Sequence, residues 1–296
     1  MATAGSSPSG NARHGILWML LAMLIAVGVD TLHKTLAQTF PVPQLVWARF
    51  AFHMVLVTLI LGRRLPRVMV TRRFDLQVAR SFFLICGTIL FVYGLSLMPL
   101  ADITAILSVA PILVTALSAP LLGERVNHRQ WIGMVLGFAG ALVIIRPGSG
   151  IMQLAALFPL GTAFFFALYQ ITTKQLSRTE HTMTMLFYSG LLGALAMSVA
   201  VPFFWVTPGA AEWLLLAMLG VFGSATQFCM IKAFEAAPAT TVAPFLYSTL
   251  IWATVSGFVF FDDLPDAWTV VGAAIIAFSG LYIARQEREG GAHGSG

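Results

Sequence analysis

Ten apolar runs, each bounded by charged residues, prolines or glycines, take up most of this chain. A helix needs about 20 apolar residues to cross the hydrocarbon core of a bilayer. With 296 residues, 58% of them hydrophobic and only 10% charged, the chain has no room left for a sizeable soluble domain. The expected fold is therefore all-α and integral to the membrane, with ten transmembrane helices near residues 15–36, 44–62, 78–98, 101–122, 130–145, 151–173, 182–204, 213–235, 239–261 and 268–284.

The basic residues are distributed unevenly between the two sides of these spans. If the N-terminus is cytoplasmic, only Lys34, Arg49 and Arg146 fall on the outer side. The cytoplasmic side then collects Arg13, Arg63, Arg64, Arg67, Arg72, Arg73, Arg80, Arg125, Arg129, Lys174, Arg178, Lys232, Arg285 and Arg288. Because Lys and Arg resist translocation, both termini are expected in the cytoplasm. The net charge of +5 therefore reflects topology, and we expect contact with the lipid bilayer and none with nucleic acid.

The two cysteines, Cys86 and Cys229, both lie within apolar runs. Their positions provide neither a disulfide framework nor a zinc-ligand spacing, and we expect no metal and no other cofactor. The polar residues 1–14 are expected to form a cytoplasmic N-terminal segment. Residues 286–296 end in a glycine-rich stretch and are expected to be a flexible cytoplasmic tail.

The two halves of the chain match each other at an offset of 139 residues. The matched pairs are Pro99 with Pro238, Glu124 with Asp263, Gly133 with Gly272, and Arg146 with Arg285. Each copy, 15–146 and 151–285, holds five spans, and an odd number makes the second copy enter the membrane from the opposite side. Such inverted repeats are typical of secondary transporters, which alternate access to a site near the bilayer midplane. Transport is therefore the leading functional class.

Several short motifs lie along the spans: Met98-Pro99-Leu100-Ala101-Asp102, Pro111, Gly123-Glu124-Arg125, the fifth-span glycines Gly133, Gly137 and Gly140, and the basic residues Lys34 and Arg49-Phe50. Together they resemble the EamA branch of the drug/metabolite transporter superfamily. The second repeat departs from the pattern, because Asp262-Asp263 replaces a Gly-Glu pair and Tyr188 stands opposite Arg49.

Within this branch the chain is most similar to YddG-type amino-acid exporters of the bacterial inner membrane. The resemblance implies a central cavity lined by the first, third, fourth, sixth, eighth and ninth helices, with no ATPase domain. It leaves the substrate open, since the same motifs serve exporters of amino acids, of other metabolites and of drugs.

Polar groups at bilayer depth are costly and so are functional candidates. Asp30, His33 and Lys34 lie in the outer third of the first span. Either Asp30 and Lys34 form an i,i+4 ion pair, or His33 and Lys34 join Arg49 to offer positive charge to a substrate carboxylate. Asp30 and His53 are candidates for proton coupling, although a buried histidine more often bonds a backbone carbonyl.

The remaining candidates lie along the other spans of the expected cavity. The inner half supplies Tyr169, Gln170 and Gln227, and the centre supplies Ser108, Tyr247 and Trp252. Tyr93 and Trp252 would give the cavity an aromatic face. Each has a structural alternative, such as a hydroxyl bonded to its own helix or core packing. Pro111 and Pro244 interrupt spans and are hinge candidates, with a static kink as the alternative. Small residues on the fifth and tenth spans favour close helix packing, within a monomer or a homodimer.

These observations predict a secondary transporter that exports amino acids and related small metabolites. A drug or other metabolite carrier of the same fold is the nearest alternative. Alternatives from a different class are a channel and an intramembrane enzyme. The enzyme is disfavoured because the sequence lacks a His-Glu-x-x-His motif and because Asp30 is the only acidic residue expected deep in the membrane.

Overall fold

The protein crosses the membrane as two five-helix repeats. The computed structural model describes residues 8–122, 128–145, 152–177, 179–237 and 242–293, and within these ranges every regular element is helical. The first repeat comprises α1 (Pro8–Leu36), α2 (Val42–Leu61), α4 (Phe74–Leu97), α5 (Leu100–Leu107) with α6 (Ala110–Leu122), and α7 (His128–Ile145). The second comprises α9 (Leu157–Leu176), α10 (Thr182–Ala200), α11 (Ala210–Ala236), η3 (Ala243–Tyr247) with α13 (Ser248–Phe261), and α14 (Ala267–His293). The expected all-α, ten-helix membrane fold is confirmed.

Short elements connect or extend some of these spans. Two of them, η1 (Gly62–Arg64) and α3 (Leu65–Val68), follow α2. The others are α8 (Met152–Ala155), which precedes α9, and η2 (Val201–Phe204), which follows α10.

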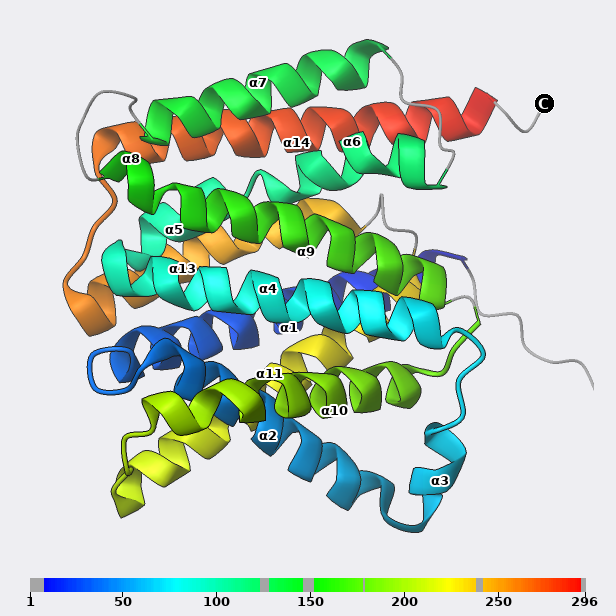
Figure 1. The fold of residues 1–296 in the computed structure, drawn as a ribbon. Helices are drawn as coiled ribbons and strands as arrows, with labels where there is room; N and C mark the ends of the chain where they lie inside the picture. The colour runs from blue at the N-terminus through cyan, green and yellow to red at the C-terminus, as the bar shows by residue number, and fades with distance from the viewer. Residues whose placement is uncertain (1–7, 123–127, 146–151, 178, 238–241, 294–296) are drawn as a thin grey trace, which may run out of the picture.

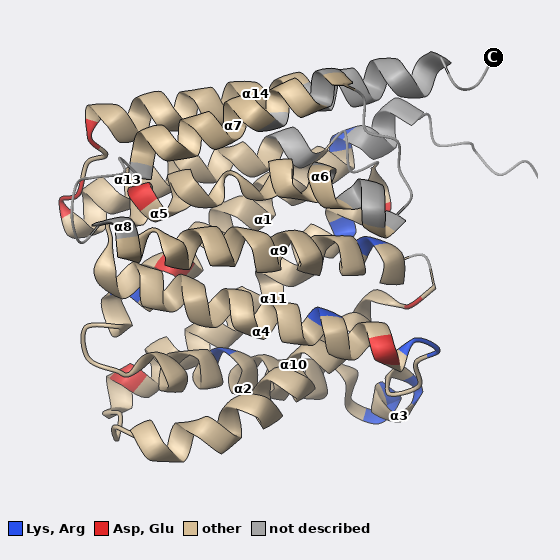
Figure 2. Cartoon of the chain, turned by 45° about the horizontal axis from the view of Figure 1, so that its top comes forward, with Lys and Arg blue, Asp and Glu red and all other residues tan. Residues whose placement is uncertain are grey.

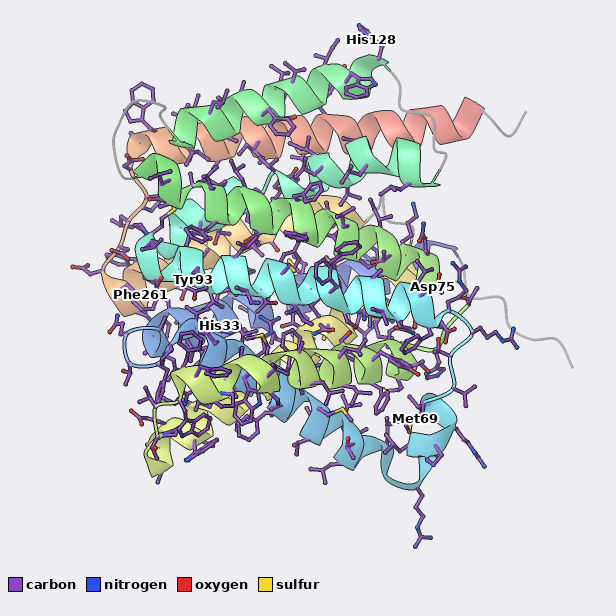
Figure 3. The ribbon with its side chains drawn as sticks, viewed as in Figure 1. His33, Met69, Asp75, Tyr93, His128 and Phe261 are labelled. Carbon is purple, nitrogen blue, oxygen red and sulfur yellow. The ribbon has the colours of Figure 1, made fainter. Side chains whose placement is uncertain are left out.

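The outer surface of the helix bundle is apolar. Large hydrophobic side chains such as Leu59, Phe203 and Phe278 are each more than two-thirds exposed. Among the described residues, five helices are long and apolar enough to cross a bilayer by themselves. Figure 3 places His33, Tyr93 and Phe261 toward one end of the bundle, and Met69 and Asp75 toward the other. We call the first the outer end and the second the inner end.

The packing of α7 against α14 displays the two-fold relation between the repeats (Figure 1). Gly140 of α7 lies against the backbone of Gly272 of α14, and the Ser279 hydroxyl donates to the Gly133 carbonyl. The offset of 139 turns Gly140 into Ser279 and Gly133 into Gly272, so these two contacts are images of each other. In the same way α1 packs on α11 as α9 packs on α4.

The fourth span of each repeat is interrupted, whereas continuous helices were expected at 101–122 and 239–261. In the first repeat the break falls at Ser108 and Val109, between α5 and α6. Pro111 follows directly, and because proline has no N–H and clashes with the preceding turn, a regular helix is disfavoured there. In the second repeat the 3-10 turn η3, which contains Pro244, precedes α13.

Some boundaries also differ from the expected ones. Helix α14 continues to His293, where a flexible tail was expected from residue 286, because the stretch 285–289 consists of the strong helix formers Arg, Gln and Glu. Helix α1 begins at Pro8, within the expected N-terminal segment, and α9 begins at Leu157, after the separate turn α8.

The glycine contact between α7 and α14 gives a stability prediction. A Cβ at Gly272 would lie 2.6 Å from the carbonyl oxygen of Gly140. We expect Gly272→Ala to destabilise the protein by about 1–3 kcal/mol through overpacking, measured as a lower melting temperature in detergent. Gly28→Ala is the matched control, because a Cβ at that helical glycine meets no atom within 4 Å. An equal melting temperature for the two variants would contradict the close approach.

Candidate functional site

A cavity of about 140 Å³ lies between the two repeats. Its walls come from the first, third, fourth, sixth, eighth and ninth spans, as the sequence resemblance implied, and from Arg49 of the second span, α2. The lining residues are Met23, Ala26, Val29, Asp30, Arg49, Thr88, Phe91, Thr104, Leu107, Ser108, Ala110, Pro111, Phe166, Gln170, Thr226, Met230, Leu246, Tyr247 and Thr249.

The interruptions of the fourth and ninth spans both lie at this cavity. Ser108, Ala110 and Pro111 line it beside the first break, and Leu246 and Tyr247 line it beside the second. Discontinuous membrane helices are tolerated where they line such a space, and transporters commonly place their substrate sites there.

Most of the cavity wall is apolar, with aromatic surface from Phe91 and Phe166. Its hydroxyl groups are largely committed to their own helices. Thr88, for example, donates to the carbonyl of Leu84 at 2.7 Å, and Ser108 donates to that of Thr104 at 2.8 Å. These hydroxyls are left with oxygen lone pairs that accept hydrogen bonds.

The two charged lining residues, Asp30 of α1 and Arg49 of α2, have opposite signs. Arg49 is 9% exposed and lies against Gly223 of α11, where an added Cβ would stand 3.3 Å from its Nε atom. That Nε has no hydrogen-bond partner among the described residues. The two charges are close enough to attract each other, but no ion pair joins them in the described part of the chain.

Four other buried polar side chains carry atoms that have no hydrogen-bond partner among the described residues. These atoms are both ring nitrogens of His33, both amide atoms of Gln77, Oε1 of Gln227 and the hydroxyl of Tyr247. Of these residues only Tyr247 lines the cavity, and its hydroxyl occupies space left free by Gly280 of α14.

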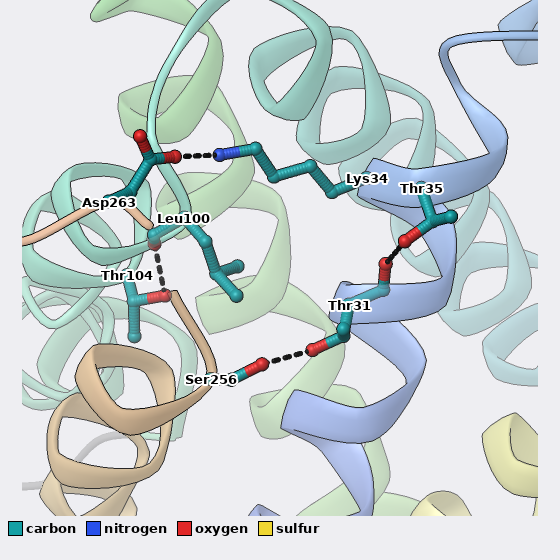
Figure 4. A network of polar contacts seen from close by, with 7 residues as sticks. All are labelled: Thr31, Lys34, Thr35, Leu100, Thr104, Ser256 and Asp263. Atoms are coloured by element: carbon teal, nitrogen blue, oxygen red, sulfur yellow. Dashed lines mark hydrogen bonds and ion pairs between the residues drawn. The ribbon is translucent and has the colours of Figure 1, made fainter. Parts of the chain in front are cut away.

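Lys34 pairs with a residue of the other repeat and not with Asp30, which lies four residues before it. Its Nζ donates to Oδ2 of Asp263 at 2.6 Å (Figure 4). The same Nζ lies 4.5 Å from the ring centroid of Phe261. One turn earlier, the Thr31 and Ser256 hydroxyls are 2.5 Å apart. The outer end of α1 is thereby tied to α13 and to the residues that follow it. We call the Lys34–Asp263 and Thr31–Ser256 contacts the outer latch.

Local backbone structure presents Asp263 to this latch. Asp262 adopts a left-handed conformation, with φ 55°, and ends α13. The N–H of Asp263 then donates to the carbonyl of Gly257 at 3.0 Å. Asparagine and aspartate tolerate this conformation better than most residues, which accounts for an aspartate at position 262.

Four of the other candidates lie away from the cavity surface. The Nε2 atom of His53 is 2.9 Å from the carbonyl oxygen of Leu186, as in the structural alternative. The hydroxyl of Tyr169 is bound by Arg80. Tyr93 is 39% exposed and stacks on Phe158, and Trp252 is 37% exposed. The expected aromatic wall is therefore built from different residues.

Arg80 is the polar residue whose place was not foreseen, since it was assigned to the cytoplasmic charges. It is fully buried in α4, near the inner end. Its guanidinium donates to the hydroxyls of Thr173, Ser189 and Tyr169 and to the carbonyl of Met185, at 2.5–3.0 Å. These bonds join α4 to α9 and α10. The sequence signal was an arginine inside an expected span, at 78–98.

Arg80 gives a second stability prediction. A lysine has a single ammonium group and cannot match the forked geometry of these four bonds. We expect Arg80→Lys to lower stability by about 2–4 kcal/mol, seen as loss of folded protein on heating in detergent. Arg73→Lys is the control, because Arg73 is exposed and pairs only locally with Asp75. Equal thermal stability of the two variants would show that the hydrogen bonds of Arg80 do not contribute to the stability of the protein.

The chain was compared with known proteins. The EamA-like transporter family matches residues 13–146 and 153–285, one copy in each repeat. The chain belongs to this family.

Curated relatives of this EamA-like protein match it over nearly their whole length. The S-adenosylmethionine uptake transporter of Rickettsia prowazekii is 28% identical and the alignment covers 93% of this chain and 94% of the relative. The riboflavin transporter of Vibrio cholerae is 30% identical, with 92% and 93% covered. The pseudopaline exporter of Pseudomonas aeruginosa is 29% identical, with 93% and 98% covered. These names support a transporter but not specifically a YddG-type amino-acid exporter.

A solved crystal structure shows the same fold. It superposes with a TM-score of 0.63 at 19% sequence identity, and the match covers 94% of this chain and 98% of the other. This likeness concerns the fold alone.

Proposed function

We propose that this EamA-like protein is a secondary transporter that exports amino acids and related small metabolites by alternating access. The observation that carries the proposal is the amphipathic cavity between the two repeats, which combines an apolar wall with Asp30 and Arg49. A ligand site of this kind holds its ligand by apolar burial and orients it with a few polar groups.

The size of the cavity favours small substrates. Pockets for drug-sized ligands have volumes of roughly 300–1,000 Å³. The cavity volume of about 140 Å³ is smaller than this, which favours a substrate of the size of an amino acid. Larger metabolites form the second candidate class, favoured by relatives named for S-adenosylmethionine and riboflavin. They require a wider state of the same cavity.

We place the protein in the bacterial inner membrane with both termini in the cytoplasm. Figure 2 shows Lys and Arg gathered around α3 and the neighbouring helix ends, at the inner end of the bundle. Because positive residues are retained in the cytoplasm, this distribution supports the proposed orientation. Relatives from bacteria support the location.

In the alternating-access mechanism the outer latch is a gate. It joins α1 of the first repeat to α13 and Asp263 of the second, so the repeats cannot separate at the outer end while it is intact. A rocking motion that exposes the cavity to the outside must break these contacts.

Counterflow tests the transport function. Proteoliposomes preloaded with one unlabelled amino acid at a time should accumulate labelled L-leucine from outside, because a carrier exchanges substrate across its alternating site. Accumulation should depend on the identity of the preload and should saturate. Preloads of riboflavin and of S-adenosylmethionine test the second class. Uptake that is independent of the preload would indicate a channel, and no uptake above empty vesicles would refute an amino-acid carrier.

Neutralising the latch tests the gate. In a variant without native cysteines, a cysteine in place of Ser108 reports access to the cavity. We expect Lys34→Gln and Asp263→Asn each to increase its labelling by a membrane-impermeant thiol reagent applied from outside, because the ion pair no longer favours the closed outer end.

Asp262→Asn is the matched control for this labelling experiment. Asp262 neighbours Asp263 but makes no ion pair in the described part of the chain, so its neutralisation should leave labelling unchanged. The exchanged pair Lys34→Asp with Asp263→Lys should restore the low labelling. Labelling that is unaffected by either neutral variant would remove the gate assignment.

A further inference from the structure

We propose that Asp30 and Arg49 bind the two charged ends of a zwitterionic substrate, with Arg49 receiving the carboxylate and Asp30 the ammonium group. This assignment rests on the proposed function, because it takes the cavity to be the transport site. It gives Asp30 a role in substrate recognition, whereas the sequence suggested proton coupling.

Asp30 and Arg49 carry opposite charges, and neither forms an ion pair in the described part of the chain. Two other cationic side chains in the described bundle have partners within the protein: Lys34 forms an ion pair with Asp263, and Arg80 donates four hydrogen bonds. Asp30 and Arg49 line one cavity but make no ion pair with each other. A charge within the bilayer is costly unless it is paired, so this arrangement favours a ligand that carries both opposite charges.

The surroundings of Arg49 favour the binding of a carboxylate. Its side chain is more than nine-tenths buried, its Nε has no partner among the described residues, and it lies against Gly223. The absence of a side chain at Gly223 lets α11 approach and confines the guanidinium. A confined guanidinium with a free donor is suited to binding a carboxylate, because its planar fork matches the two oxygens.

The rest of the cavity wall is largely apolar. Phe91, Leu107, Phe166 and Met230 come from α4, α5, α9 and α11, and none of them is charged. They offer an apolar surface to the side chain of the substrate, while α1 and α2 supply both charges. The site therefore matches a small zwitterion with an apolar side chain, and it opposes ligands with a single charge, which leave Asp30 or Arg49 without a partner.

Three related probes test the assignment by competition in L-leucine counterflow: L-leucine itself, L-leucinamide, which lacks the carboxylate, and 4-methylpentanoate, which lacks the ammonium group. For the unaltered protein we expect L-leucine to compete about 10-fold to 100-fold better than either analogue, the effect of losing one charge-assisted bond. Arg49→Gln should remove the preference for L-leucine over L-leucinamide. Asp30→Asn should remove the preference over 4-methylpentanoate.

These reciprocal changes separate recognition from a structural role, because a purely structural role would lower L-leucine counterflow without changing the relative competition by the three probes. Asp75→Asn and Arg73→Gln are matched charge-neutralising controls at an exposed ion pair, and both should keep the original ratios. Asp30→Glu and Arg49→Lys retain the charges and should retain the preference for the zwitterion. They keep the test decisive if a neutral variant fails to fold.

The possible failures are distinct. Saturable L-leucine counterflow with ratios that neither neutral variant changes, or with equal competition by all three probes in the unaltered protein, overturns the assignment of Asp30 and Arg49 alone. The absence of L-leucine counterflow above that of empty vesicles overturns the proposed function together with it.

Discussion

The cost of removing charge from water organises this structure. A chain with so few charged residues still places several of them among its helices. Their partners differ with their position in the bundle. Arg80 is held by hydroxyls and a carbonyl, and so braces three helices. Lys34 finds a carboxylate in the other repeat. Asp30 and Arg49 face the cavity. Arg80, Lys34 and Asp263 thus join helices to one another, whereas Asp30 and Arg49 line the central cavity.

The fold could be predicted from the sequence because its determinants are local. Apolar runs give the spans, and a constant offset gives the repeat. Continuous helices were expected for the fourth and ninth spans, although Pro111 and Pro244 were identified as possible hinges or kinks within them. Contacts between residues distant in sequence could not be predicted in this way. Nothing near Lys34 identifies Asp263 as its partner. Arg80 was counted among the cytoplasmic charges, because its partners in α9 and α10 are brought to it only by helix packing.

The candidate site was predictable only in part. Asp30, Arg49, Ser108, Gln170 and Tyr247 do line the cavity. The aromatic residues Tyr93 and Trp252 do not, because a helix that is apolar on all sides carries no signal for its rotation about its axis. Depth in the membrane follows from counting residues, whereas the direction in which a side chain points is set by packing against other helices. Phe91 and Phe166 therefore took the place of the expected aromatic wall.

The repeats interlock instead of standing apart: α1 packs on α11, α4 on α9, and α7 on α14. Neither half alone has partners for these faces. An unfused ancestor of five helices would have had to insert into the membrane in both orientations, in equal amounts, before any pair could assemble. Joining the halves in one chain removes that requirement, since every molecule carries one copy of each orientation. It also frees the two copies to diverge, so that a lysine in one can come to depend on an aspartate in the other.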